Sequence, residues 1–432
     1  MRRVLVAGVM VGAMSVGVAA QQAPPVTQGQ PQQAVQQAPA PPDHARTLVG
    51  RLDLAKYKAT IKGLTQFGDR REGTERNRKA VDWIEAQLKS YGCETGRLTY
   101  DPANPRGLSE AELERQRAGR GGGNQGRGGG QGAGRGNQPQ TPPRVPAGTA
   151  EDPVRRGAGG KGFGARTGVN NDPMRQPDEK LRALNQGPII PGKVDMVYCT
   201  KWGTTRRGEM YIVGGHMDGI GYGEAANDDG SGSAIVMELA RVFNSPDVTT
   251  DVSIRFALWN GEEGGLKSAN AYVAQRAERQ GQPDEPKWLG MVQHDMMMFD
   301  HGMPNPDGTL RAEQRREADV NIEFQENSKM AMESARLAIT FKIANGRYAT
   351  DYPATIGPHM QSTDSVPFQD LIPSISLREN ERRDHIGSGW DPHWHQPTDL
   401  YATFTDADFK LGLNAAQTTL AAIAQLAKAV VK

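Results

Sequence analysis

The amino-acid sequence predicts an α/β fold, a three-layer sandwich in which helices flank both faces of a mostly parallel, mixed central sheet. Short apolar runs alternate along the chain with stretches in which apolar residues recur at helical spacing. Several of the apolar runs end in histidine, aspartate or glutamate. In open α/β sheets, ligands bind at the carboxyl ends of the strands, so we expect these polar side chains to form one site.

Length and composition set the outer limits. The 432 residues suffice for one large domain or two ordinary ones. A net charge of +1 gives the whole chain no electrostatic preference for nucleic acid or for an anionic membrane. The two cysteines cannot form a zinc-finger cluster or a dense disulfide framework. Local motifs must therefore indicate the chemistry.

The first residues have the pattern of an export signal. Two arginines precede an apolar run over residues 4–18, and the small residues up to Ala20 form a cleavage site. The run is shorter than the roughly 17 to 25 residues that span a bilayer, and no cysteine follows it for a lipid anchor. We expect residues 1–20 to be a signal peptide, residues 21–45 to be a Gln/Pro/Ala-rich tether, and the protein to be secreted or periplasmic without a stable membrane anchor.

An insertion interrupts the folded domain, which we place at residues 46–432. Helical spacing predicts two helices between residues 54 and 88, and a strand follows near residue 98. From about 105 to 187 the chain is rich in Gly, Arg and Gln with almost no apolar residues, so we expect this segment to be disordered. Similar Gly/Arg runs bind RNA, but in an exported protein a solvated insertion with no nucleic-acid partner is the better interpretation.

The two cysteines lie at the open end of a predicted hairpin. The strand resumes at Val194, so the insertion takes the place of the hairpin turn, where extra length costs little. The start of one strand then faces the end of the other, which brings Cys93 near Cys199. The oxidising compartment of an exported protein permits a disulfide. The sequence leaves both a disulfide and two free thiols open.

The first polar cluster follows an apolar strand at residues 211–213. The strand ends in His216 and Asp218, and the glycines around them allow the backbone to turn sharply. Asp228 comes shortly before Ser231, which is a suitable N-cap for the helix that follows. Imidazole and carboxylate groups at the mouth of an α/β unit indicate a metal site.

Three further polar clusters follow. The buried strand at residues 252–259 leads into Glu262 and Glu263. Adjacent side chains in an extended segment point to different sides, so one carboxylate can bind a metal while its neighbour faces substrate. A strand that begins near residue 289 ends in Asp295, and the last cluster surrounds His395.

Five motifs resemble those of one enzyme family, the co-catalytic di-zinc aminopeptidases. They occur in the family's order and close to its spacing: GGHMDG, ANDDGSG, WNGEEGGLKSA, QHDM and WHQPTD. The family also contains glutamate carboxypeptidases and, as a divergent branch, glutaminyl cyclases. The resemblance covers the chain from roughly residue 64 to the C-terminus and implies the zinc exopeptidase fold.

The resemblance implies a centre with two zinc ions per chain. By this resemblance His216 and Asp295 hold one ion. Glu263 and His395 hold the other, and Asp228 bridges the two. Zinc favours nitrogen and oxygen ligands, and two zinc ions roughly 3.5–4 Å apart can share a hydroxide.

The resemblance also implies roles beside the metal ions. Glu262 would be the general base that takes a proton from the bridging water and returns it to the leaving amine. Asp218 would orient His216. The peptide bond from Asp228 to Asp229 would be cis, which turns the bridging carboxylate inward.

Two positions depart from the family pattern. Trp394 stands where the peptidases of the family often have a tyrosine, and glutaminyl cyclases also have a tryptophan at this position. The indole N–H of Trp394 can still donate to an oxyanion. Ser365 replaces the histidine of the family's Ser-Asp-His, while Asp364 is retained. We therefore expect the contacts to substrate in this segment to differ from those of the family.

The resemblance implies a secreted zinc-dependent aminopeptidase that hydrolyses N-terminal residues of peptides through a zinc-bridged hydroxide. Three alternatives remain open. Trp394 favours a glutaminyl cyclase, whereas the complete ligand set disfavours it. A carboxypeptidase needs a cationic pocket, which Arg378, Arg382 or Arg383 can supply. An inactive binding module would tend to lose ligands or the base, and none is missing here. The oligomeric state is left open.

Overall fold

The computed structural model of the protein describes residues 42–121, 155–156, 164–165, 169–299, 320–379, 391 and 393–432. The expected signal peptide and most of the expected tether lie outside these residues. Residues Asp43–Lys432 form one unit, and the following description concerns that unit.

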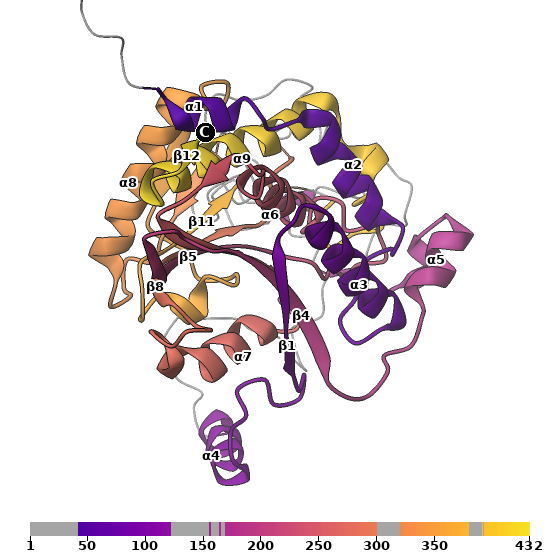
Figure 1. The fold of residues 1–432 in the computed structure, drawn as a ribbon. Helices are drawn as coiled ribbons and strands as arrows, with labels where there is room; N and C mark the ends of the chain where they lie inside the picture. The colour runs from indigo at the N-terminus through magenta and orange to yellow at the C-terminus, as the bar shows by residue number, and fades with distance from the viewer. Residues whose placement is uncertain are drawn as a thin grey trace, which may run out of the picture. The chain divides into compact units, whose positions relative to one another are not determined.

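A mixed, eight-stranded sheet forms the centre of the fold (Figure 1). Its strand order is β1-β4-β7-β5-β8-β11-β9-β10. The inner strands β7, β5, β8 and β11 run parallel, β10 is parallel to β9, and the other three pairings are antiparallel. The strands are β1 Glu94–Tyr100, β4 Val194–Lys201, β5 Arg206–His216, β7 Val252–Trp259, β8 Lys287–His294, β9 Val320–Glu323, β10 Ala354–Gly357 and β11 Ser374–Arg378, with short pairs β2 Arg155–Arg156 with β3 Gly164–Ala165 and β6 Val248–Thr249 with β12 Val430–Val431.

Helices cover both faces of the sheet, which confirms the predicted fold class (Figure 1). Most of them pack on one face, while α7 and a 3-10 turn at Val366–Phe368 pack on the other. Within the described residues, no helix is both long and apolar enough to cross a membrane. The helices are α1 His44–Val49, α2 Leu54–Thr65, α3 Glu75–Ser90, α4 Glu110–Gly121, α5 Glu179–Asn185, α6 Gly230–Phe243, α7 Lys267–Arg276, α8 Ala331–Tyr348 and α9 Asp406–Leu426.

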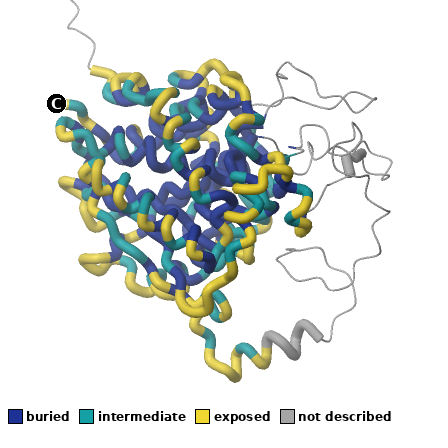
Figure 2. The backbone as a smooth tube through the Cα atoms, turned by 90° about the vertical axis from the view of Figure 1, so that its right-hand side faces the viewer, coloured by how far each residue is buried: buried dark blue, intermediate teal, exposed yellow. Residues whose placement is uncertain are grey.

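Side-chain alternation along the strands divides the core into two hydrophobic clusters. Val213 packs in the larger cluster, with α6 and α9, and its neighbour Ile212 packs in the smaller one, with α7. Helix α6 is buried along its whole length except at Arg241. Figure 2 shows that the buried residues gather in the middle of the fold and the exposed ones at its edge. This buried helix begins at the site, so its first turn is held firmly beside the strand ends.

The N-terminus of α6 differs from the sequence prediction. Asp229, rather than Ser231, is the N-cap, and its carboxylate accepts a hydrogen bond from the backbone N–H of Gly232 at 2.8 Å. The helix begins at Gly230, so Ser231 lies inside the first turn, where its hydroxyl donates to the carbonyl of Asn227 at 2.8 Å. The cap therefore comes from the acidic motif itself.

The predicted insertion does take the place of a hairpin turn, because β1 and β4 pair antiparallel along β1. Its described ends are folded, which corrects the expectation of disorder over the whole of 105–187. Helix α4 lies at one end, and a 3-10 turn at Pro173–Arg175 and α5 lie at the other. Polar side chains near α5 have backbone partners elsewhere in the fold, so this end is held without apolar burial. Residues 122–154, 157–163 and 166–168 lie outside the described residues.

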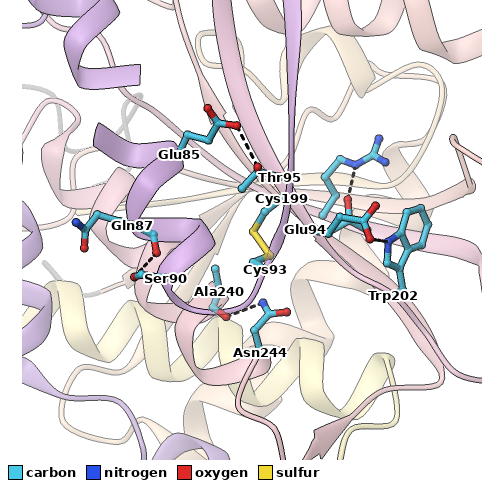
Figure 3. Close-up of a disulfide and its surroundings, with 12 residues drawn as sticks. Glu85, Gln87, Ser90, Cys93, Glu94, Thr95, Cys199, Trp202, Ala240 and Asn244 are labelled. Atoms are coloured by element: carbon cyan, nitrogen blue, oxygen red, sulfur yellow. Dashed lines mark hydrogen bonds between the residues drawn. A yellow bond between two sulfur atoms is a disulfide. The ribbon is translucent and has the colours of Figure 1, made fainter. Parts of the chain in front are cut away.

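Cys93 and Cys199 form a disulfide, which decides between the two alternatives left open by the sequence (Figure 3). Their Cα atoms are 5.7 Å apart, and Cys199 lies opposite Thr95 in the β1–β4 pairing. Both cysteines are buried under α3, whose Glu85 accepts a hydrogen bond from the Thr95 hydroxyl at 3.0 Å (Figure 3). The bond links the two ends of the segment that contains the insertion.

Candidate metal centre

The strand order explains why distant residues meet. His216 is the last residue of β5, Asp295 follows β8 directly, and Glu262 and Glu263 follow β7 by a few residues. Strand β5 lies between β7 and β8 and is parallel to both, so the three carboxyl ends are neighbours. The alternation of buried strands and helices thus brings the predicted ligands to one edge of the sheet.

Asp228 stands between two histidines. Its Oδ1 lies 3.2 Å from Nε2 of His216, and its Oδ2 lies 2.9 Å from Nε2 of His395. On the outer sides, His216 Nε2 is 3.9 Å from Asp295 Oδ1, and His395 Nε2 is 2.8 Å from Glu263 Oε2. The five predicted ligands therefore come together as two groups that share one carboxylate.

The donor set fits zinc. Two ligand atoms on a tetrahedral zinc, each about 2.0–2.1 Å from the ion, are about 3.3 Å apart, which lies within the spread of the distances above. Ligand atoms of His216, Asp228 and Glu263 all lie within 4.8 Å of one another, as do those of His216, Glu262 and Asp295. In addition, Glu263 Oε1 is buried and has no hydrogen-bond donor in the described part of the chain. An imidazole and carboxylate cluster with an unsatisfied oxygen is a suitable cation site.

The electrostatics of the cluster also favour a cation. Burial lowers the pKa of His395, but the carboxylates of Glu263 and Asp228 outweigh burial and raise it to about 10. Burial raises the pKa of Glu262 to about 8, and the neighbouring carboxylates Glu263 and Asp295 add to this rise. Several carboxylates thus share a low-dielectric space, where a divalent cation relieves their mutual repulsion.

Asp218 contacts His216 through its backbone. The carbonyl oxygen of Asp218 lies 3.0 Å from Nδ1 of His216, while its carboxylate is 3.8 Å from that nitrogen. The carboxylate instead accepts from the backbone N–H groups of Glu262 at 3.1 Å and Glu263 at 3.4 Å. Asp218 therefore connects the end of β5 to the turn after β7.

Two further aspartates hold the segment that carries Asp228. The Asp228–Asp229 peptide bond is cis, as the resemblance implied. Asp229 accepts the backbone N–H of His216 at 2.9 Å. Asp399 accepts the backbone N–H groups of Asn227 at 2.8 Å and Asp228 at 3.1 Å. Asp399 belongs to the WHQPTD motif, but the sequence alone indicates no role for it.

Trp394 and Asp364 lie in or beside the cluster. The Trp394 indole stacks on the ring of His395, with centroids 3.9 Å apart and planes 26° apart. Asp364 is fully buried, and its Oδ2 accepts from Gln293 at 3.3 Å, while Oδ1 has no donor among the described residues. Burial raises the pKa of Asp364 well above its ordinary value, and the nearby charge of Glu262 adds to this rise.

Arg378 is a buried cation at the end of β11. Its guanidinium donates to Asp295 Oδ2 and to the carbonyl of Ser362, the latter at 2.9 Å. The side chains of Arg378 and Asp295 are each 3% exposed. Since Arg378 already donates to a predicted ligand, it is a poor partner for a substrate carboxylate, which weakens the carboxypeptidase alternative. Arg382 and Arg383 lie outside the described residues.

Arg70 is a supporting residue that sequence reasoning missed. It is completely buried, and its guanidinium donates to the backbone carbonyls of Met217 at 2.7 Å, Glu224 at 2.8 Å and Ala225 at 2.7 Å. It thereby closes the loop between β5 and α6. Its partners are carbonyl groups far along the chain, so no local sequence pattern marks it.

Known proteins share parts of this sequence and this fold. A stretch of 72 residues is 36% identical to aminopeptidase YwaD of Bacillus subtilis (strain 168), and it covers 17% of this chain but only 15% of that protein. The fold is similar to that of BSAP, a zinc aminopeptidase from Bacillus subtilis, with 18% identity, a TM-score of 0.56 and coverage of 87% of this chain and 95% of that one. The fold is also similar to that of Porphyromonas gingivalis glutaminyl cyclase, with 13% identity, a TM-score of 0.50 and coverage of 87% of this chain and 99% of that one. The sequence profile of peptidase family M28 matches residues 197–414, half of the chain, and the protein therefore belongs to peptidase family M28.

Proposed function

We propose that the protein is a zinc-dependent exopeptidase, and specifically an aminopeptidase that removes N-terminal residues from peptides. One observation carries the proposal: the two carboxylate oxygens of Asp228 face two different histidines, His216 and His395. This arrangement is suited to a pair of metal ions bridged by one carboxylate. We assign His216 and Asp295 to one zinc, Glu263 and His395 to the other, and Asp228 to both.

Zinc bound by these residues supplies a Lewis acid for the scissile carbonyl and a water that is acidic enough to be deprotonated near neutral pH. Glu262 would take a proton of that water as general base and pass it to the nitrogen of the scissile bond. The water oxygen would bond to the carbonyl carbon as the C–N bond breaks, which leaves a carboxylate on the released residue and a free amine on the shortened peptide. The backbone N–H of Glu262 is fixed by Asp218, which orients the base.

The charges around the cluster favour a substrate with a free amine. The buried, unpartnered oxygen of Asp364 can accept a hydrogen bond from an ammonium group, whereas a C-terminal carboxylate has no hydrogen to donate to it. Of the buried arginines near the predicted ligands, Arg378 is bound to Asp295 and Arg70 to backbone carbonyls. Both facts support an aminopeptidase over a carboxypeptidase.

We also propose that the protein acts outside the cytoplasm. The N-terminal pattern predicts export, and the Cys93–Cys199 disulfide supports an oxidising compartment. The segment between the paired strands would then be an insertion within the peptidase domain that is folded at both of its described ends.

A glutaminyl cyclase is the second candidate, because Trp394 stacks on His395 at the position where the related peptidases often have tyrosine. An indole in this place offers an N–H donor whose reach differs from that of a tyrosine hydroxyl. A cyclase would convert an N-terminal glutamine to pyroglutamate without hydrolysing a peptide bond.

The test compares aminoacyl p-nitroanilides with their N-acetylated counterparts, with and without a chelator, and includes a peptide with N-terminal glutamine. We expect cleavage of the free-amine substrates only, and loss of activity with the chelator or in Glu262→Gln. Glu278→Gln, which changes an exposed glutamate, is the matched control and should retain wild-type rates. Pyroglutamate formation without anilide cleavage would transfer the assignment to the cyclase.

A further inference from the structure

The C-terminal part of the predicted insertion, residues 169–187, contains buried amide side chains. We call this segment the arm; it includes the 3-10 turn at Pro173–Arg175 and helix α5. Asn170 and Gln176 are each 1% exposed, and Asn185 is 4% exposed. Buried amides on a segment with few apolar contacts require specific partners, because an unpaired buried amide is costly.

The partners of the arm are backbone groups of two loops at the metal centre. We call residues 219–225 the glycine loop and residues 393–399 the histidine loop. The Gln176 side-chain amide donates to the carbonyl of Tyr222 at 2.8 Å and to that of Pro397 at 3.0 Å, so it joins both loops. Asn170 also joins the two loops. Its backbone N–H donates to the carbonyl of His395 at 3.0 Å, and its side-chain amide donates to the carbonyl of Gly221 at 3.2 Å.

Asn185 fastens the other end of the arm. Its side-chain amide donates to the carbonyl of Gly223 at 2.8 Å, and its side-chain oxygen accepts the backbone N–H of Asp69 at 3.0 Å. The Arg76 guanidinium donates to the Asn185 carbonyl at 3.1 Å and pairs with Asp69 at 2.7 Å. The arm is thus fixed to the α3 region on one side and to the two loops on the other.

The two loops have a conformation that needs external support. His395 and Tyr222 have positive φ angles of 56° and 69°, which non-glycine residues rarely adopt. Gly221 has φ of 101°, and a Cβ there would lie 2.4 Å from the carbonyl group of His395. The loops therefore pack backbone to backbone, and the arm supplies hydrogen-bond donors to both.

We propose that the arm is a positioning element of the metal centre, which holds His395 so that its Nε2 faces Asp228 and Glu263. The inference rests on the metal-binding role proposed above for His395. Gln176 is the key residue, because one side chain spans both loops. Through these contacts, part of a segment that the sequence marks as an insertion belongs to the machinery that retains zinc at His395.

The test measures zinc release into excess chromophoric chelator from wild type, Gln176→Glu and Asn170→Ala. Gln176→Glu keeps the size of the side chain but removes both donors and places a carboxylate against two carbonyl groups. His395→Ala identifies the release phase that belongs to the His395 ion, because that phase should be missing. We expect this phase to become roughly 10- to 100-fold faster in Gln176→Glu and Asn170→Ala, as for other residues that orient metal ligands.

Asn171→Ala is the matched control, since Asn171 is the exposed neighbour of Asn170 and its hydrogen bond among the described residues stays within the arm. It should release zinc at the wild-type rate. The melting temperature of the metal-free proteins separates positioning from general destabilisation. A lower melting temperature in Gln176→Glu with unchanged zinc release would overturn the inference. Zinc release needs no substrate, so it tests the arm separately from the proposed peptidase activity. If the variants release zinc faster but the wild type cleaves no peptide, the role of the arm stands and the proposed function fails. A wild type that binds no zinc would refute both proposals.

Discussion

Replacing Arg378 by methionine tests whether a buried guanidinium balances the charge of Asp295. Both side chains are 3% exposed, and Arg378 also donates to the carbonyl of Ser362 at 2.9 Å. Methionine is flexible and uncharged, and its side chain can replace the aliphatic part of the arginine side chain. The substitution therefore removes the charge and the hydrogen bonds while retaining much of the packing.

The structure allows the size of the effect to be worked out. Removing one partner of a buried ion pair costs about 3–5 kcal/mol, because the remaining charge is left uncompensated. Loss of the contact that orients Asp295 would by itself weaken zinc binding by about 10- to 100-fold, or about 1.4–2.7 kcal/mol. Bound zinc also relieves the uncompensated charge of Asp295, and this gain is the larger of the two effects. The variant should therefore gain more stability from zinc than wild type does.

The assay is urea unfolding of wild type and Arg378→Met in EDTA and in excess zinc. We expect the free energy of unfolding to fall by about 3–5 kcal/mol in EDTA, and by less in zinc. Arg279→Met is the control, since Arg279 is half exposed and its surface pair with Asp284 is worth about 0–1 kcal/mol. A loss no larger than the control's, or an equal loss in the two media, would refute the reasoning.

Three further predictions follow from particular contacts. Double substitution of Cys93 and Cys199 by alanine should lower the free energy of unfolding by about 4–5 kcal/mol in denaturant titrations, because the disulfide joins residues 106 apart; a loss below about 1 kcal/mol would contradict this. Burial raises the pKa of Glu85, but hydrogen bonds from a lysine, an arginine and a threonine outweigh burial and lower it to about 2. The stability that Glu85 contributes is therefore present above its ordinary pKa of 4.5 and lost as the pH falls toward 2, so unfolding titrations of wild type and Glu85→Gln should converge over that range. Gly221→Ala should reduce kcat/KM by on the order of 100-fold, since a Cβ would displace the backbone of His395, and retention of wild-type activity would contradict that packing.

The location of the site could be predicted from the sequence. Strand β7 has the predicted bounds, and the residues that follow β5, β7 and β8 are the ones that meet. The reason is physical: an apolar run must be buried, and the first charged residues after it lie at the edge of the sheet. Sequence alone also placed Cys93 and Cys199 near one another, because their strands form the two sides of one hairpin.

The supporting contacts could not be predicted in this way. The buried amides of Asn170, Gln176 and Asn185 bind backbone carbonyls, and any residue can present a carbonyl, so no pattern in the partner sequence marks the contact. Arg378 lies 83 residues from Asp295, and only the pairing of β11 with β8 brings them together. Composition likewise suggested a solvated segment at residues 169–187. The structure differs because polar side chains can be buried when each one is hydrogen-bonded.

Zinc-edge anomalous diffraction from crystals of the zinc-loaded protein locates the metal ions themselves. We expect two anomalous peaks per chain, roughly 3.5–4 Å apart, on either side of the Asp228 carboxylate. One peak should lie beside His216 and Asp295, and the other beside Glu263 and His395. A single peak, or two peaks that do not share Asp228, would contradict the proposed centre.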